Sequence, residues 1–64
     1  MRYTEFWSRL EDAVSPAYAQ TWASDQVIGA LGSRTVVEAL DDGVPPKEVW
    51  REVWRVLDLP ASQR

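Results

Sequence analysis

This chain of 64 residues contains neither cysteine nor histidine, and that absence limits what it can fold into. Without these residues, the chain has neither a disulfide nor a zinc site of the usual kind that would stabilise a small domain. A domain of this size lies near the lower limit for folding alone, so dense apolar packing or association has to stabilise it. Four tryptophans, two tyrosines and one phenylalanine can supply the packing. Each buried aromatic side chain removes about 150–250 Å² from water.

Apolar periodicity predicts a single all-α domain over residues 1–64, built from four helices. We expect these helices at residues 4–14, 16–31, 35–42 and 46–57, with the third short and residues 61–64 a frayed tail. The second helix has the least regular pattern, because Tyr18 and Trp22 lie on a different side from Ile28 and Leu31. We interpret it as one helix contacted from several sides, and a bend near Ser24-Asp25 is the alternative.

The apolar faces of these helices predict the core, and two local motifs predict helix starts. Ser15-Pro16 suits the beginning of the second helix, and the run from Thr35 to Glu38 has the spacing of a capping box. Asp41-Asp42 falls near the end of the third helix, where the helix dipole disfavours carboxylates, and we interpret the pair as solvated in a turn. The expected core residues are Phe6, Leu10, Val14, Trp22, Leu31, Leu40, Val49, Trp50, Val53 and Leu57.

The net charge of −3 is distributed unevenly along the chain. Residues 1–42 hold three basic and seven acidic side chains, whereas residues 43–64 hold four basic and three acidic ones. An acidic body disfavours non-specific binding to phosphate backbones, and only the last helix escapes that objection. Charged residues interrupt the apolar residues near the N-terminus, so the sequence predicts no signal peptide, no membrane span and a cytoplasmic location.

The residue types of common catalytic centres are missing. No histidine or cysteine is present to act as a base, a nucleophile or a metal ligand, and the hydroxyl groups have no activating partner. The adjacent carboxylates of Glu11-Asp12 and Asp41-Asp42 diverge on a helix, so neither pair forms a dyad. We therefore expect a non-enzymatic protein without a catalytic residue, a metal or a cofactor.

Candidate binding residues lie on the last predicted helix. Lys47, Arg51 and Arg55 recur every four residues and form a stripe, which we call the basic stripe. Trp54 lies where this stripe meets the apolar face, a position that suits an interface anchor or a ring that packs under a cation. Glu48 and Glu52 also allow ordinary surface ion pairs with the two arginines. Our hypothesis is a protein-interaction module that binds another protein through Trp54 and the basic stripe, and homodimerisation through exposed aromatic side chains is a further alternative.

Residues 35–57 also match the spacing of a helix-turn-helix. Ala39 allows close approach, Gly43 turns the chain, and Val49 anchors the second helix. The second helix would then present the basic stripe and Trp50 to nucleic acid. The motif is unspecific, because any helix pair in a globular core needs such residues, and it places Trp50 outside the apolar face. Nucleic-acid binding is therefore the alternative hypothesis.

Short motifs follow one another along nearly the whole chain. They are Met1-Arg2, Thr4-Glu5-Phe6-Trp7, Tyr18-Ala19, Trp22-Ala23, Asp25, Leu31-Gly32, Arg34-Thr35-Val36, Glu38-Ala39-Leu40, Gly43-Val44 and Lys47-x-Val49-Trp50. In their order and spacing they resemble the domain of unknown function 3046 family (DUF3046), which consists of small actinobacterial helical proteins. Pro45-Pro46 departs from the pattern. The resemblance implies a short cytoplasmic helical protein without an assigned activity or site residues. It also implies a gene neighbourhood with the recombinase RecA and its regulator RecX, which favours a partner in DNA repair.

Overall fold

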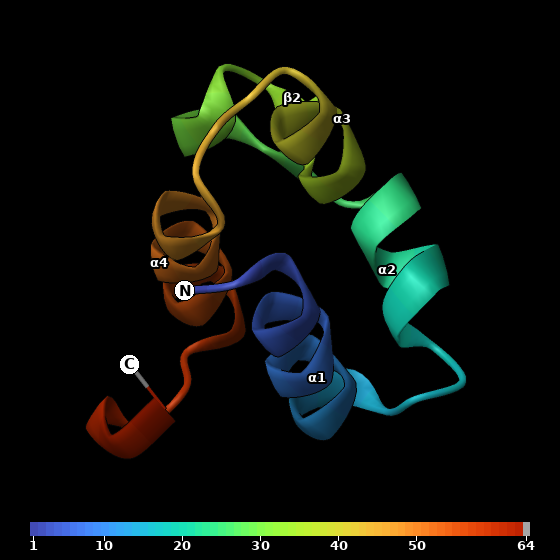
Figure 1. Cartoon of the computed structure of the whole chain (residues 1–64), viewed down its shortest axis with the longest axis vertical. Coiled ribbons are helices and arrows are strands. Elements are labelled where there is room, and N and C mark those ends of the chain that lie inside the picture. Colours follow the sequence, from blue (N-terminus) through green and yellow to red (C-terminus); the bar gives the residue numbers. More distant parts are fainter. Residues whose placement is uncertain (64) are drawn as a thin grey trace.

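The computed structural model describes residues 1–63, which fold into four α-helices around one apolar core (Figure 1). The helices are α1 (Tyr3–Val14), α2 (Ala19–Asp25), α3 (Val36–Asp41) and α4 (Pro46–Leu57). Between α2 and α3, two short strands flank a 3-10 helix: β1 (Val27–Ile28), η1 (Gly29–Leu31) and β2 (Arg34–Thr35). A second 3-10 helix, η2 (Ala61–Gln63), ends the described chain. The predicted all-α class is confirmed, with a two-residue antiparallel strand pair as the small addition.

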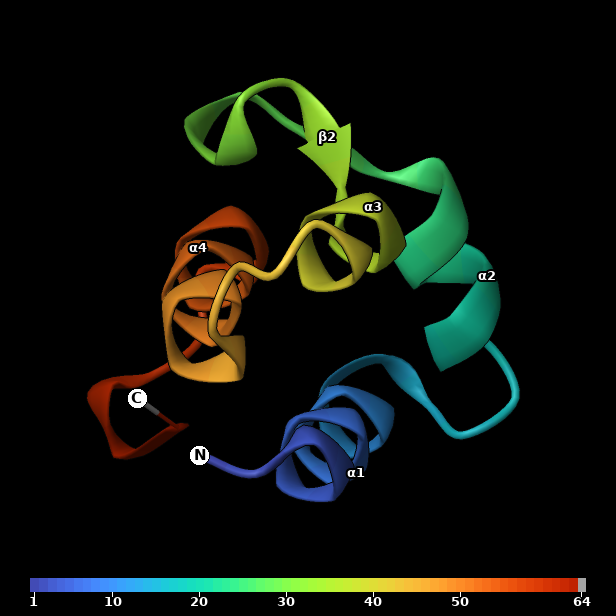
Figure 2. The same ribbon diagram turned by 45° about the horizontal axis from the view of Figure 1, so that its top comes forward.

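The helices form a ring in which each contacts the next, and α4 contacts α1 again (Figure 2). Phe6 connects α1 to α4, because its aromatic side chain packs edge-to-face on Trp50 of α4 with 5.9 Å between the ring centroids. Trp7 packs against the same phenylalanine at 5.6 Å. No helix in the described residues is long and apolar enough to cross a membrane.

The core confirms most of the predicted positions. The buried apolar residues are Phe6, Leu10, Ala19, Trp22, Ala23, Ile28, Leu31, Val36, Ala39, Val49, Trp50 and Val53. Seven of the ten predicted core residues are among them, and the other three, Val14, Leu40 and Leu57, are partly buried and pack against this cluster. Small residues fill the closest helix contacts: Ala19 and Ala23 of α2 and Ala39 of α3 are buried almost completely.

The predicted helix over residues 16–31 is wrong, because the chain leaves the helical conformation at Gln26. There the backbone is extended, with φ −81° and ψ 112°, and β1 then pairs with β2 in antiparallel register. The break has a packing reason. A continuous helix would send Trp22 and Ile28 to different sides, whereas the break brings both side chains into one core, at 8% and 3% exposure. Tyr18 stays 51% exposed.

The start of α2 follows the predicted serine motif, although the regular helix begins later. The Ser15 hydroxyl accepts a hydrogen bond from the Tyr18 N–H at 3.2 Å, and the Ser15 carbonyl accepts one from the Ala19 N–H at 3.0 Å. Residues 16–18 form a turn, and the helix continues from Ala19. The Ser15-Pro16 pair therefore sets the direction in which α2 leaves α1.

The C-terminal segment of residues 59–63, which we call the strap, folds back onto α4. The indole N–H of Trp50 donates to the Gln63 carbonyl and the indole N–H of Trp54 donates to the Pro60 carbonyl, both at 2.9 Å. Leu59 packs against the core, whereas residues 60–63 are exposed. The sequence predicted a frayed tail at 61–64. Residues 61–63 form the exposed 3-10 helix η2, and residue 64 lies outside the described residues. Fraying of this tail in solution stays a prediction.

Candidate binding site

A capping box fixes the start of α3, the helix that precedes α4. The Thr35 hydroxyl accepts a hydrogen bond from the Glu38 N–H at 3.2 Å, and the Glu38 carboxylate accepts one from the Thr35 N–H at 2.9 Å. This reciprocal pair is a capping box, as predicted from the spacing. Thr35 is only 9% exposed, so the cap also satisfies polar groups at the edge of the core.

A tight turn then leads from α3 into α4. Gly43 has φ +93°, a left-handed conformation that costs glycine little. Its N–H donates to the Leu40 carbonyl at 3.1 Å, and the Val44 N–H donates to the Ala39 carbonyl at 3.0 Å. These two bonds form a Schellman motif that satisfies the last carbonyls of α3. Pro46 opens α4 at its first helical position, where a missing N–H has no cost.

The acidic end of α3 has a partner outside the helix. Arg34 Nε of β2 lies 3.3 Å from Asp42 Oδ2, and both side chains are about half exposed. The predicted solvated position fits Asp41, which is exposed, whereas Asp42 forms this ion pair. The pair offsets part of the unfavourable charge at the end of the helix.

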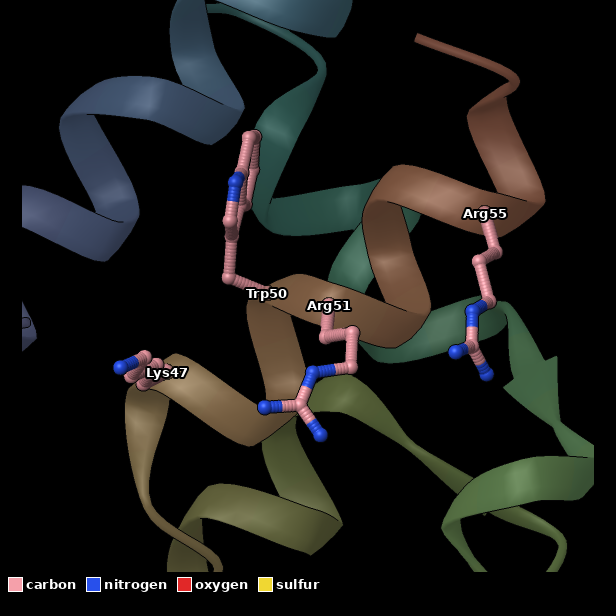
Figure 3. Close-up of a pocket in the computed structure, with 4 residues that line it drawn as sticks. All are labelled: Lys47, Trp50, Arg51 and Arg55. Carbon is pink, nitrogen blue, oxygen red and sulfur yellow. The ribbon is translucent and has the colours of Figure 1, made fainter. Parts of the chain in front are cut away.

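The basic stripe surrounds one hollow on the surface of α4. Lys47, Arg51 and Arg55 line a cavity of about 340 Å³ together with Trp50. Figure 3 shows the three cationic side chains following one another along α4, with the Trp50 ring pointing away from them. Trp50 is 1% exposed, so the hollow offers almost no ring surface. A ligand in the hollow would therefore mainly contact the aliphatic chains and charged groups of the three cationic residues.

Two of the three cations have no ion-pair partner within residues 1–63. Arg55 Nη1 lies 3.1 Å from Glu52 Oε1, which is one of the surface ion pairs that the spacing predicted. No such pair joins Glu48 to Arg51 in residues 1–63, and Lys47 and Arg51 make no ion pair or side-chain hydrogen bond there. The N-terminal half of the stripe therefore presents uncompensated positive charge.

The two tryptophans of α4 have different surroundings. Trp50 is buried against Phe6, so it does not present its ring as the helix-turn-helix hypothesis required. Trp54 is partly buried, and its N–H bonds to the strap. Its suggested role as an interface anchor stays a prediction. The strap was not predicted, because no motif in residues 59–63 indicates that their carbonyls meet indole N–H groups.

The other features of the described residues add no second site. No group of three or more carboxylates in residues 1–63 is placed to hold a metal ion. Every buried side-chain nitrogen or oxygen in that part of the chain has a hydrogen-bond partner. Within the described residues, the hollow along the basic stripe therefore combines a concave surface with cations that lack an ion-pair partner.

Comparison with known proteins gives one match. The family described as "Protein of unknown function (DUF3046)" matches residues 1–62, which is nearly the whole chain. Comparison with curated proteins and with solved structures gives no match.

Proposed function

Because the chain belongs to the DUF3046 family, whose description assigns no activity, we propose a function from the chain's own surface. The protein is a non-enzymatic interaction module that binds a partner protein through the basic stripe. One observation carries this proposal: Lys47 and Arg51 share a hollow with Arg55 and have no counter-charge within residues 1–63.

The charge pattern supports a protein partner with an acidic surface. Complementary charges steer encounter and exclude wrong partners, so an uncompensated cationic strip favours a ligand that brings carboxylates. The hollow presents one ammonium and two guanidinium groups, which suit recognition of carboxylates. The compartment in which such a partner meets the protein is expected to be the cytoplasm.

A second candidate function is nucleic-acid binding, which the α3–turn–α4 geometry favours. α3 packs on α4 across a glycine turn, and the exposed face of α4 carries the basic stripe. Three features weigh against it: the carboxylates of Glu48 and Glu52 flank the stripe, Trp50 is buried, and the net charge is −3.

The family resemblance adds a direction to the search for a partner. It implies genes for the recombinase RecA and its regulator RecX nearby, so proteins of DNA repair are the first candidates for the partner. Purified forms of these two proteins can be tested directly, and an acidic surface on either one would be the expected contact.

The test compares partner recovery by a variant of the basic stripe with partner recovery by a variant of a surface arginine outside the stripe. Tagged wild type, Arg51→Ala and Arg9→Ala are cross-linked in a native lysate and their partners identified. Arg9 is a suitable control because it is a surface arginine of α1 whose Nη2 lies 3.2 Å from Glu5. We expect the Arg9→Ala variant to recover the wild-type partner and Arg51→Ala to lose it. Equal recovery by all three proteins would remove the stripe as the binding site.

Two further measurements separate the alternatives. A steep salt dependence of binding to duplex DNA that flattens in Arg51→Ala would favour the nucleic-acid candidate, and no binding at low salt would dismiss it. Light scattering at several concentrations tests homodimerisation, for which Tyr3, with 53% of its surface exposed, is the most exposed ring.

A further inference from the structure

The strap shares its attachment point with the hollow. Trp50 lines the hollow and also donates its indole N–H to the Gln63 carbonyl of the strap. Trp54 follows one helical turn later and donates to Pro60. Residues spaced three or four apart on a helix are neighbours, so Trp50 follows Lys47 and Trp54 follows Arg51 on the surface of α4, although the Trp50 ring points away from the cations (Figure 3). The strap therefore occupies one edge of the candidate binding site.

The strap supplies hydrogen-bond acceptors to this edge but no negative charge. Residues 59–63 contain no side-chain carboxylate. In the described part of the chain, Lys47 and Arg51 therefore have no ion-pair partner, from the strap or from elsewhere. A carboxylate in the same place would accept the indole N–H and pair with a cation, and hydrogen bonds to charged acceptors are stronger than those to neutral carbonyls.

The strap is also attached weakly enough to be replaced. Residues 60–63 are exposed, and the contacts of the strap with α4 include the two indole bonds and a hydrogen bond from the Leu59 N–H to the Trp54 carbonyl at 3.1 Å. The Leu59 side chain packs against the core. Ordering an exposed segment costs conformational entropy that these hydrogen bonds only partly offset.

We infer that the strap is an autoinhibitory stand-in for the partner, and that an acidic segment of the partner protein binds α4 by displacing it. This inference rests on the proposed function, because it uses the same cations. The incoming segment places oxygen acceptors on the indole N–H groups of Trp50 and Trp54 and carboxylates on Lys47 and Arg51.

The test uses poly-L-glutamate as the acidic probe and NMR as the readout. The full chain is labelled with ¹⁵N, so that each tryptophan indole gives its own signal. We expect the probe to shift the indole signals of Trp50 and Trp54 but not that of Trp22 in the opposite part of the core. Arg51→Ala should weaken binding about tenfold.

Loosening the strap should strengthen binding, which distinguishes autoinhibition from a structural role. Leu59→Asn removes the packing of the strap and leaves α4 unchanged, and Leu59→Ala is the milder form. Apparent affinity rises with the fraction of molecules in the open state, so we expect poly-L-glutamate to bind about two- to tenfold more tightly. The matched control is Val56→Asn, since Val56 is already 46% exposed at the end of α4. It should bind as the wild type does.

Several results would overturn the inference. Unmoved indole signals at saturating probe would do so, as would equal affinities for the Leu59 variants and Val56→Asn. Duplex DNA that shifts both indoles where poly-L-glutamate does not would replace the acidic segment by a nucleic acid. Binding that depends on Arg51 but is insensitive to Leu59 would end the strap inference and leave the proposed function intact. Partner capture that ignores Arg51 would end the proposed function itself.

Discussion

The capping box at the start of α3 gives the sharpest test of how this small domain is stabilised. α3 is a helix of only six residues, which is too short to persist without its ends being satisfied. Thr35 and Glu38 satisfy two N–H groups reciprocally, and Thr35 is 9% exposed. Thr35→Ala removes the hydroxyl that accepts from the Glu38 N–H.

The magnitude follows from the lost bond. Replacing a threonine cap by alanine costs about 1 kcal/mol, within a range of roughly 0.5–2 kcal/mol. A domain of this size has a free energy of unfolding of roughly 3–10 kcal/mol, so the loss is a large fraction of the total. In melting temperature, 1 kcal/mol corresponds to a decrease of about 4–8 °C for a small domain. Glu38→Ala should also destabilise, because the Thr35 N–H then loses its acceptor.

Urea and thermal unfolding, followed by circular dichroism and tryptophan fluorescence, measure both changes. The double variant tests the reciprocity, and we expect its loss to differ from the sum of the single losses by about 0.5 kcal/mol or more. Thr21→Ala is the matched control, because Thr21 is exposed within α2, where alanine is the better helix former. If Thr35→Ala unfolds within about 0.3 kcal/mol of Thr21→Ala, the cap contributes nothing and the reasoning is refuted.

Three further predictions concern α4 and its neighbours. Asp58→Gly should stabilise the protein by about 0.5–1 kcal/mol, seen as a higher melting temperature, because Asp58 has φ +53° and carries a negative charge at the end of a helix. Trp50→Phe should lower the free energy of urea unfolding by about 1–3 kcal/mol, since it loses the bond to Gln63 and leaves a void. Arg34→Ala should cost less than about 1 kcal/mol, with thermal melts at low and high salt nearly equal, because the pair with Asp42 is half exposed.

The elements that the sequence predicted best are those with signals in their own residues. The predicted range 46–57 coincides with α4, because Pro46 suits a first helical position and a strongly amphipathic pattern follows it. The start of α3 was predicted for the same reason, since the capping box of Thr35 and Glu38 is complete within four residues.

The end of α2 had a weaker signal, the irregular apolar pattern that made a bend near Ser24-Asp25 the alternative to one continuous helix. α2 does end at Asp25, although no glycine or proline occurs between Ala19 and Ile28. The break is imposed by the core, which accepts Trp22 and Ile28 together only when the chain turns extended at Gln26. The strands β1 and β2 are invisible in the sequence, because two residues are too few to show alternation.

The sequence predicted only part of the candidate site, because only that part depends on residues that are close together in the sequence. Four-residue spacing places Lys47, Arg51 and Arg55 on one face of any helix, and the structure gathers them around one hollow. The strap depends instead on a reversal of the chain at Asp58, which takes the left-handed conformation without being glycine. A contact between indole N–H groups and carbonyls across such a reversal has no signature in the sequence.

The geometry of α4 allows recognition and stability to be changed separately. The charged heads of Lys47 and Arg51 are exposed and make no ion pair within residues 1–63, so their replacement should leave the free energy of unfolding nearly unchanged. Trp50 is part of the core and both Trp50 and Trp54 bond to the strap, so replacing either ring alters intramolecular contacts and the site together. A cation variant that loses its partner but unfolds as the wild type does therefore reports on recognition, whereas the same loss in a tryptophan variant does not.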